Sequence, residues 1–65
     1  MDKQELKPED TCREVLGETL HGGVRTILYF FDENGTPCLE KGSKQLLAVE
    51  FDKDGHEVFT THGSR

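Results

Sequence analysis

Hydrophobic residues of this chain cluster between Val24 and Phe59, where apolar and polar positions follow a period of two. Residues 24–31 are rich in β-branched and aromatic side chains, and both faces of the segment are apolar, with Ile27, Tyr29 and Phe31 on one side. Such a run is typical of a central strand that is covered on both faces. Residues 45–51 form a second predicted strand, with Leu47, Val49 and Phe51 on one face and Leu46, Ala48 and Glu50 on the other.

A five-residue phrase occurs twice, as Phe31-Asp32-Glu33-Asn34-Gly35 and Phe51-Asp52-Lys53-Asp54-Gly55. Each copy closes an apolar run, and Asn-Gly and Asp-Gly accept the positive φ of a tight turn, so both copies predict β-hairpins. The returning strands would be residues 38–40, where Pro37 indicates an edge or a bulge, and residues 57–61. The turn resembles the hairpins of YD-repeat proteins over residues 28–39 and 48–59, and we carry over no function from this likeness.

The segment before Val24 has the pattern of an amphipathic helix over residues 11–21. Thr11 and Glu14 match a capping box, and Gly22-Gly23 supplies a stop. The apolar positions follow helical spacing: Cys12, Val15, Leu16 and Leu20. The alternative is a strand over residues 14–20 that pairs with the next segment through a loop at residues 21–23.

The predicted fold class is therefore α+β: a short N-terminal helix followed by a four-stranded antiparallel β-meander. If residues 11–21 form a strand instead, the prediction becomes an all-β five-stranded meander. We expect a flexible N-terminal arm at residues 1–9, a single small domain at residues 10–62 and a tail at residues 63–65. A chain of 65 residues is near the lower size limit for folding alone, which favours stabilisation by association.

Acidic residues outnumber basic ones, and the net charge is −5. The basic residues are dispersed, without the stripe and interleaved aromatics of a phosphate-binding surface, so we expect no nucleic-acid ligand. No segment has the apolar length of a leader or a membrane span, and the expected location is the cytoplasm. A candidate acidic face consists of six carboxylates: Asp32, Glu33, Glu50, Asp52, Asp54 and Glu57.

Candidate chemistry is sparse. A calcium loop that begins at Asp52 would need glycine at its sixth position and glutamate at its twelfth, but Glu57 and Gly63 stand there. The histidines and cysteines lack zinc-site spacing, and Cys12 and Cys38 are expected to be free thiols. We therefore predict no metal, no cofactor, no small-molecule substrate and no catalytic residues.

The predicted function is protein–protein association through a β-sheet face, by a small non-catalytic accessory or regulatory protein. The partner would be another protein or a second copy of the chain in a homodimer. The candidate interface residues are Leu28, Tyr29, Phe30, Leu46 and Ala48. Two alternatives are an acidic inhibitor that mimics nucleic acid or docks on a basic protein surface, and a nucleic-acid-binding sheet with Tyr29, Phe30 and Phe31 as stacking platforms.

Overall fold

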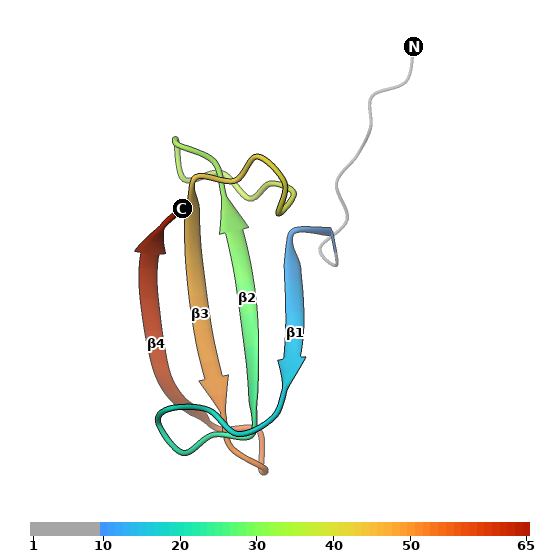
Figure 1. Cartoon of the computed structure of the whole chain (residues 1–65), viewed down its shortest axis with the longest axis vertical. Helices are drawn as coiled ribbons and strands as arrows, with labels where there is room; N and C mark the ends of the chain where they lie inside the picture. The colour runs from blue at the N-terminus through green and yellow to red at the C-terminus, as the bar shows by residue number, and fades with distance from the viewer. Residues whose placement is uncertain (1–9) are drawn as a thin grey trace.

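The computed structural model describes residues 10–65 as one four-stranded antiparallel sheet in which neighbours in sequence are neighbours in space (Figure 1). The strands are β1 (Cys12–Leu16), β2 (Arg25–Phe31), β3 (Gln45–Phe51) and β4 (Glu57–Ser64). Within these residues there is no α-helix. The predicted arm at residues 1–9 lies outside the described part of the chain. β4 continues to Ser64, beyond the predicted segment 57–61.

The two central strands pair over their whole length, and this pairing defines two faces. Ile27 lies opposite Val49, and Tyr29 lies opposite Leu47. Because side chains alternate along a strand, the residues between them project from the other side of the sheet. We call the first side the Tyr29 face, which comprises Ile27, Tyr29, Phe31, Leu47, Val49 and Phe51. We call the second side the Leu28 face, which comprises Thr26, Leu28, Phe30, Leu46, Ala48 and Glu50.

The predicted helix over residues 11–21 is wrong, because part of this segment forms the edge strand β1. β1 is held by long-range pairing: Phe30 N–H donates to Thr11 C=O, and Gly17 N–H donates to Val24 C=O. Gly17 adopts a φ of 133°, which ends the strand and is incompatible with a helix. The helical signals are local and weak, and pairing with the edge of β2 overrides them.

The predicted strand at residues 38–40 is also absent, so the five-stranded alternative is wrong as well. One isolated bridge joins Phe31 to Pro37, and Cys38 N–H donates to Phe30 C=O. The N–H and C=O groups of Phe30 both point to the same edge of β2. The C=O accepts the hydrogen bond from Cys38 N–H, and the N–H donates to Thr11, just before β1. β1 therefore occupies the edge that a returning strand would need, and residues 38–44 remain a loop.

Both repeated phrases form turns of the same kind, which confirms the predicted hairpin corners. Gly35 and Gly55 have φ values of 84° and 85°, and no other residue type in the described chain has a positive φ. A type I′ turn needs positive φ at two central residues, so these are instead longer turns that end in a left-handed glycine. In each copy the aspartate N–H donates to the carbonyl four residues on, at Thr36 and His56.

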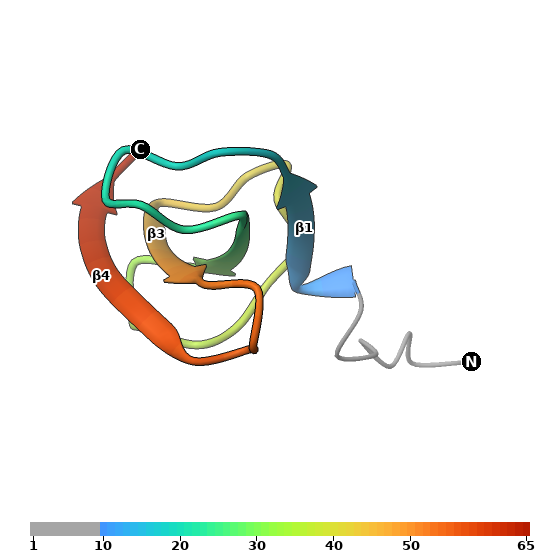
Figure 2. The ribbon, with the colours of Figure 1, turned by 90° about the horizontal axis from the view of Figure 1, so that it is seen from below.

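The core is small and lies on both sides of the central strands. Phe30, on the Leu28 face, is 2% exposed, and Val49, on the Tyr29 face, is 8% exposed. Figure 2, a view along the strands, shows a strongly twisted single sheet with the loop between β1 and β2 running along one side of it. Within residues 10–65 no second sheet or helix covers either face.

Candidate functional site

The Tyr29 face carries a continuous row of apolar side chains on the two central strands. All six residues are half-buried except Val49, which is buried by its neighbours in the sheet. Polar contacts stand at both ends of this face: the Arg25 guanidinium lies 5.0 Å from the centre of the Phe51 ring and donates to Glu14 at 2.8 Å, and at the other end the Gln45 side-chain amide donates to the Asp32 carbonyl at 2.9 Å. The row is therefore an apolar surface with a charged pair at one end.

The Leu28 face, which holds most of the candidate interface, receives contacts from loops. The register places Leu28 opposite Ala48 and Phe30 opposite Leu46, so these four residues are direct neighbours, whereas Tyr29 projects from the other face. The Arg65 guanidinium lies 5.4 Å from the centre of the Phe30 ring.

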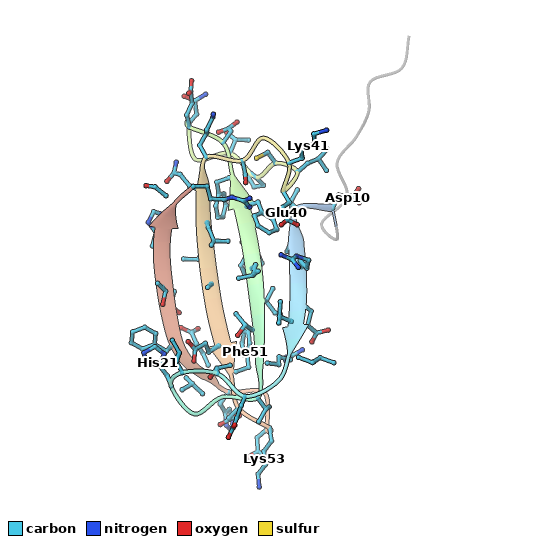
Figure 3. All side chains as sticks on the ribbon, in the orientation of Figure 1. Asp10, His21, Glu40, Lys41, Phe51 and Lys53 are labelled. Atoms are coloured by element: carbon cyan, nitrogen blue, oxygen red, sulfur yellow. The ribbon has the colours of Figure 1, made fainter. Side chains whose placement is uncertain are left out.

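The loop after the first turn contacts the Leu28 face at the end where Arg65 lies over Phe30. Glu40 lies 3.1 Å from the Arg13 guanidinium and 3.9 Å from that of Arg65. Figure 3 shows Glu40 close to one end of β1 and His21 at the opposite end of the sheet. Loops therefore reach the Leu28 face at both of its ends.

At the second end a glutamate of β3 is enclosed by the loop between β1 and β2. Glu50 is 8% exposed, and His21 binds it twice, through Nδ1 at 2.8 Å and through its backbone N–H at 3.2 Å. The imidazole also stacks on Phe59 of β4, with ring centres 3.7 Å apart. These contacts clamp the loop onto β3 and β4.

The protonation of Glu50 is set by the same loop. The hydroxyl of Thr19 and then the two His21 contacts stabilise the carboxylate and lower the pKa of Glu50, although burial opposes the shift. Gly23 brings the loop close to β3, since a Cβ there would lie 2.8 Å from the Phe51 carbonyl oxygen. The sequence pattern predicts Glu50 as part of the candidate acidic face and residue 21 as the end of a helix. Only the polar position of Glu50 inside an apolar run signalled a buried ionic contact.

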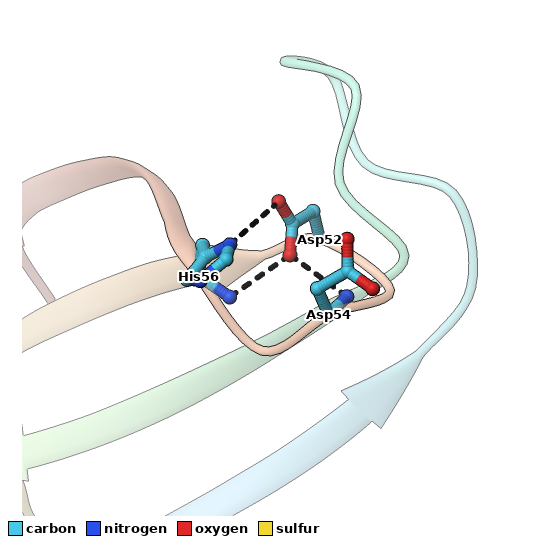
Figure 4. A group of neighbouring side chains, drawn as sticks. All are labelled: Asp52, Asp54 and His56. Atoms are coloured by element: carbon cyan, nitrogen blue, oxygen red, sulfur yellow. Dashed lines mark hydrogen bonds and ion pairs between the residues drawn. The ribbon is translucent and has the colours of Figure 1, made fainter.

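A cluster of titratable groups lies at the second repeated turn: Asp52, Asp54 and His56 (Figure 4). Their nearest ligand atoms lie within 4.8 Å of one another. One carboxylate oxygen of Asp52 already accepts the N–H groups of Asp54 and His56, both at 2.9 Å, and these bonds lower the pKa of Asp52. The other Asp52 oxygen lies 3.7 Å from the His56 imidazole. These contacts build the turn from its own side chains.

Asp32 has the same role in the first turn, where its carboxylate accepts from Asn34 at 2.8 Å and from Thr36 at 3.0 Å. The structural meaning of the repeated aspartate is thus an Asx turn.

The carboxylates of the candidate acidic face do not gather on one face. Asp32 and Glu33 follow β2, whereas Asp52 and Asp54 follow the antiparallel strand β3 and therefore lie at the opposite end of the sheet. Glu50 is enclosed beneath His21, and Glu57 accepts a hydrogen bond from the Thr60 hydroxyl at 2.6 Å.

Cys12 and Cys38 are half-buried, and neither forms a disulfide within residues 10–65. Among residues 10–65 no helix has the length and apolarity needed to cross a membrane. Comparison of the chain with protein-family models, curated proteins and solved structures returned no match.

Proposed function

We propose that this protein is a small non-catalytic module that binds another protein through the Tyr29 face of its sheet. The observation that carries the proposal is the row of apolar side chains on β2 and β3, for which the described chain supplies no covering layer. Five of these six side chains are half-buried and thus keep part of their surface accessible, and contiguous accessible apolar surface on a small domain usually marks an association site. The loop contacts of residues 10–65 on the Leu28 face favour the Tyr29 face as the docking side.

The amino acids of this face suit a protein ligand. Aromatic residues are enriched at the centres of protein interfaces, and a tyrosine can bury its ring while its hydroxyl finds a polar partner. Tyr29 is half-buried and lies between Ile27 and Phe31 on its own strand and opposite Leu47 on the next. The charged pair Arg25–Glu14 stands at the margin, as expected for the polar rim of an interface.

The test is site-specific photocrosslinking in the cells that express the protein, with p-benzoylphenylalanine placed at position 29. Its para-substituted phenyl ring takes the place of the tyrosine ring and carries the photoreactive ketone beyond it, toward a bound partner, so the expected result is a discrete adduct of higher mass. The control carries the same photoreactive group in place of Glu33, an exposed turn residue outside the face. No adduct from position 29, or the same adducts from both positions, would contradict the proposal.

A further inference from the structure

We propose that a second copy of this chain docks on the β4 edge of the sheet, so that two β4 strands pair antiparallel about a two-fold axis. The proposal concerns the edge of the sheet and does not depend on the Tyr29 face. β4 is the last strand of the sheet, and in the described chain its backbone pairs only with β3.

The register shows which backbone groups of β4 are available. Arg65 N–H donates to Lys44 C=O, and alternate pairs of an antiparallel ladder carry the hydrogen bonds. The residues of β4 that bond to β3 are therefore Phe59, Thr61 and Gly63. The N–H and C=O groups of Thr60, His62 and Ser64 consequently point away from the sheet.

This edge lacks the devices that usually block strand addition. Natural edges are protected by lysine, proline, bulges or short length. β4 has eight residues, and the stretch from Val58 to Ser64 contains no lysine, no proline and no carboxylate. Its one irregularity lies at the start of the strand, opposite Glu50 and Phe51. The other edge of the sheet, β1, has only five residues and includes the charged Arg13 and Glu14.

We place the two-fold axis at Thr61, a register in which the sequence of β4 is compatible with its own reverse. Thr60 then pairs with His62 of the second copy, and each such pair exchanges N–H···O bonds through the outward groups. The contact is isologous, as in most homodimers. A chain with a net charge of −5 meets its copy here along a stretch without carboxylates, which avoids repulsion between like charges.

Side chains on the Leu28 side also match in this register. Phe59 lies opposite Gly63 of the second copy, where an aromatic ring can cover the glycine across the strands. Phe59 is 42% exposed, and His21 stacks on its ring and holds it in place. The two Thr61 side chains meet at the axis, and threonine pairs are favourable across antiparallel strands.

The register is tested by disulfide trapping in the full chain, with Cys12→Ser and Cys38→Ser in the background. In a non-hydrogen-bonded antiparallel pair the Cα atoms lie about 4.5 Å apart, within disulfide range. Thr61→Cys should therefore form a disulfide-linked dimer under mild oxidation. Thr60→Cys is the matched control, because position 60 faces position 62 of the second copy, and we expect at least about tenfold less dimer.

Sedimentation of the unmodified chain should give twice its mass of 7.4 kDa, and Thr60→Pro should give the monomer. Proline is tolerated on an edge strand where its missing N–H faces outward, so this variant should keep its circular dichroism spectrum. A monomeric unmodified chain, a dimer that Thr60→Pro leaves intact, or equal trapping at positions 60 and 61 would overturn the proposal. If Thr60→Pro fails to fold, the trapping comparison still decides the outcome.

Discussion

Glu50 is a buried acidic residue whose carboxylate joins a loop to the sheet. Its carboxylate lies on β3, is almost fully covered, and is held by Thr19 and His21 of the loop between β1 and β2. A buried carboxylate without such partners would be strongly destabilising. Within the described residues no buried side-chain nitrogen or oxygen lacks a hydrogen-bond partner. The loop is thus attached to the sheet through one ionised group.

This attachment predicts a loss of stability in acid. The pKa of Glu50 is lower in the folded state than in the unfolded chain, so the unfolded state binds the proton more readily. Its contribution is fully present above the ordinary glutamate pKa of about 4.3 and disappears as the pH falls through the lower folded value. Urea unfolding between pH 6 and pH 3 should show a steeper loss for the wild type than for Glu50→Gln. Parallel pH profiles for the two proteins would contradict this role of Glu50.

At the scale of elements, the two repeated turns have the same geometry, but only the second is followed by a β-strand. Both close through an aspartate that accepts two backbone N–H groups and a glycine with positive φ. The second turn leads into the eight-residue strand β4, whereas the first leads to a single bridge at Pro37. A turn sequence specifies the corner, and the free edge that follows it decides whether a strand forms.

The glycine of the second turn should be sensitive to substitution. Gly55→Ala meets no neighbouring atom but forces a side chain into the left-handed region, which costs about 1–2 kcal/mol of unfolding free energy. Gly63→Ala, compared at protein concentrations at which the chain is monomeric, is the matched control, because its added Cβ also meets nothing within the chain and its φ is not positive. Equilibrium urea unfolding of both variants should show a loss for Gly55→Ala alone. Equal effects at the two positions would show that φ is not the cause.

At the scale of the whole molecule, the described chain is a single-layered sheet. Its central strands are shielded from solvent by their own side chains, by the edge strands and by the loops. The central strands hold the buried apolar side chains, whereas four of the five residues of β1 are exposed. Local opening is easiest where few apolar contacts must be broken. The fold is therefore expected to loosen first at β1.

Hydrogen exchange measures this difference in local stability between β1 and the central strands directly. Amides of Ile27 and Tyr29, which bond toward β3, should exchange most slowly, and those of Arg13 and Val15 in β1 should exchange faster by at least about tenfold. The amides of both strands are hydrogen-bonded in the sheet. A difference in their exchange rates therefore reports the stability of the strands and not a lack of hydrogen bonding. Equal protection of β1 and β2 would mean that the sheet opens only as a whole.

The local part of this fold can be read from the chain alone. The period-two runs correctly predict β2 and β3, and the repeated aspartate–glycine phrases correctly place both corners, because both signals depend on neighbouring residues. For the candidate functional surface, the alternation of side chains along β2 and β3 is sufficient to divide them between the two faces of the sheet.

The remaining features depend on which segment reaches each edge of β2, and no local pattern contains that information. Residues 12–16 carry helical signals yet form a strand, since pairing with β2 satisfies their backbone across a long loop. Because β1 already pairs with this edge of β2, residues 38–40 have no strand to pair with there and form no strand themselves. The enclosure of Glu50 by His21 follows from this arrangement, because the loop from β1 must cross β3 and β4 before it enters β2 (Figure 1). Competition for strand edges is a property of the folded chain, and it is the physical reason that the tertiary structure, and not the sequence pattern, decided these elements.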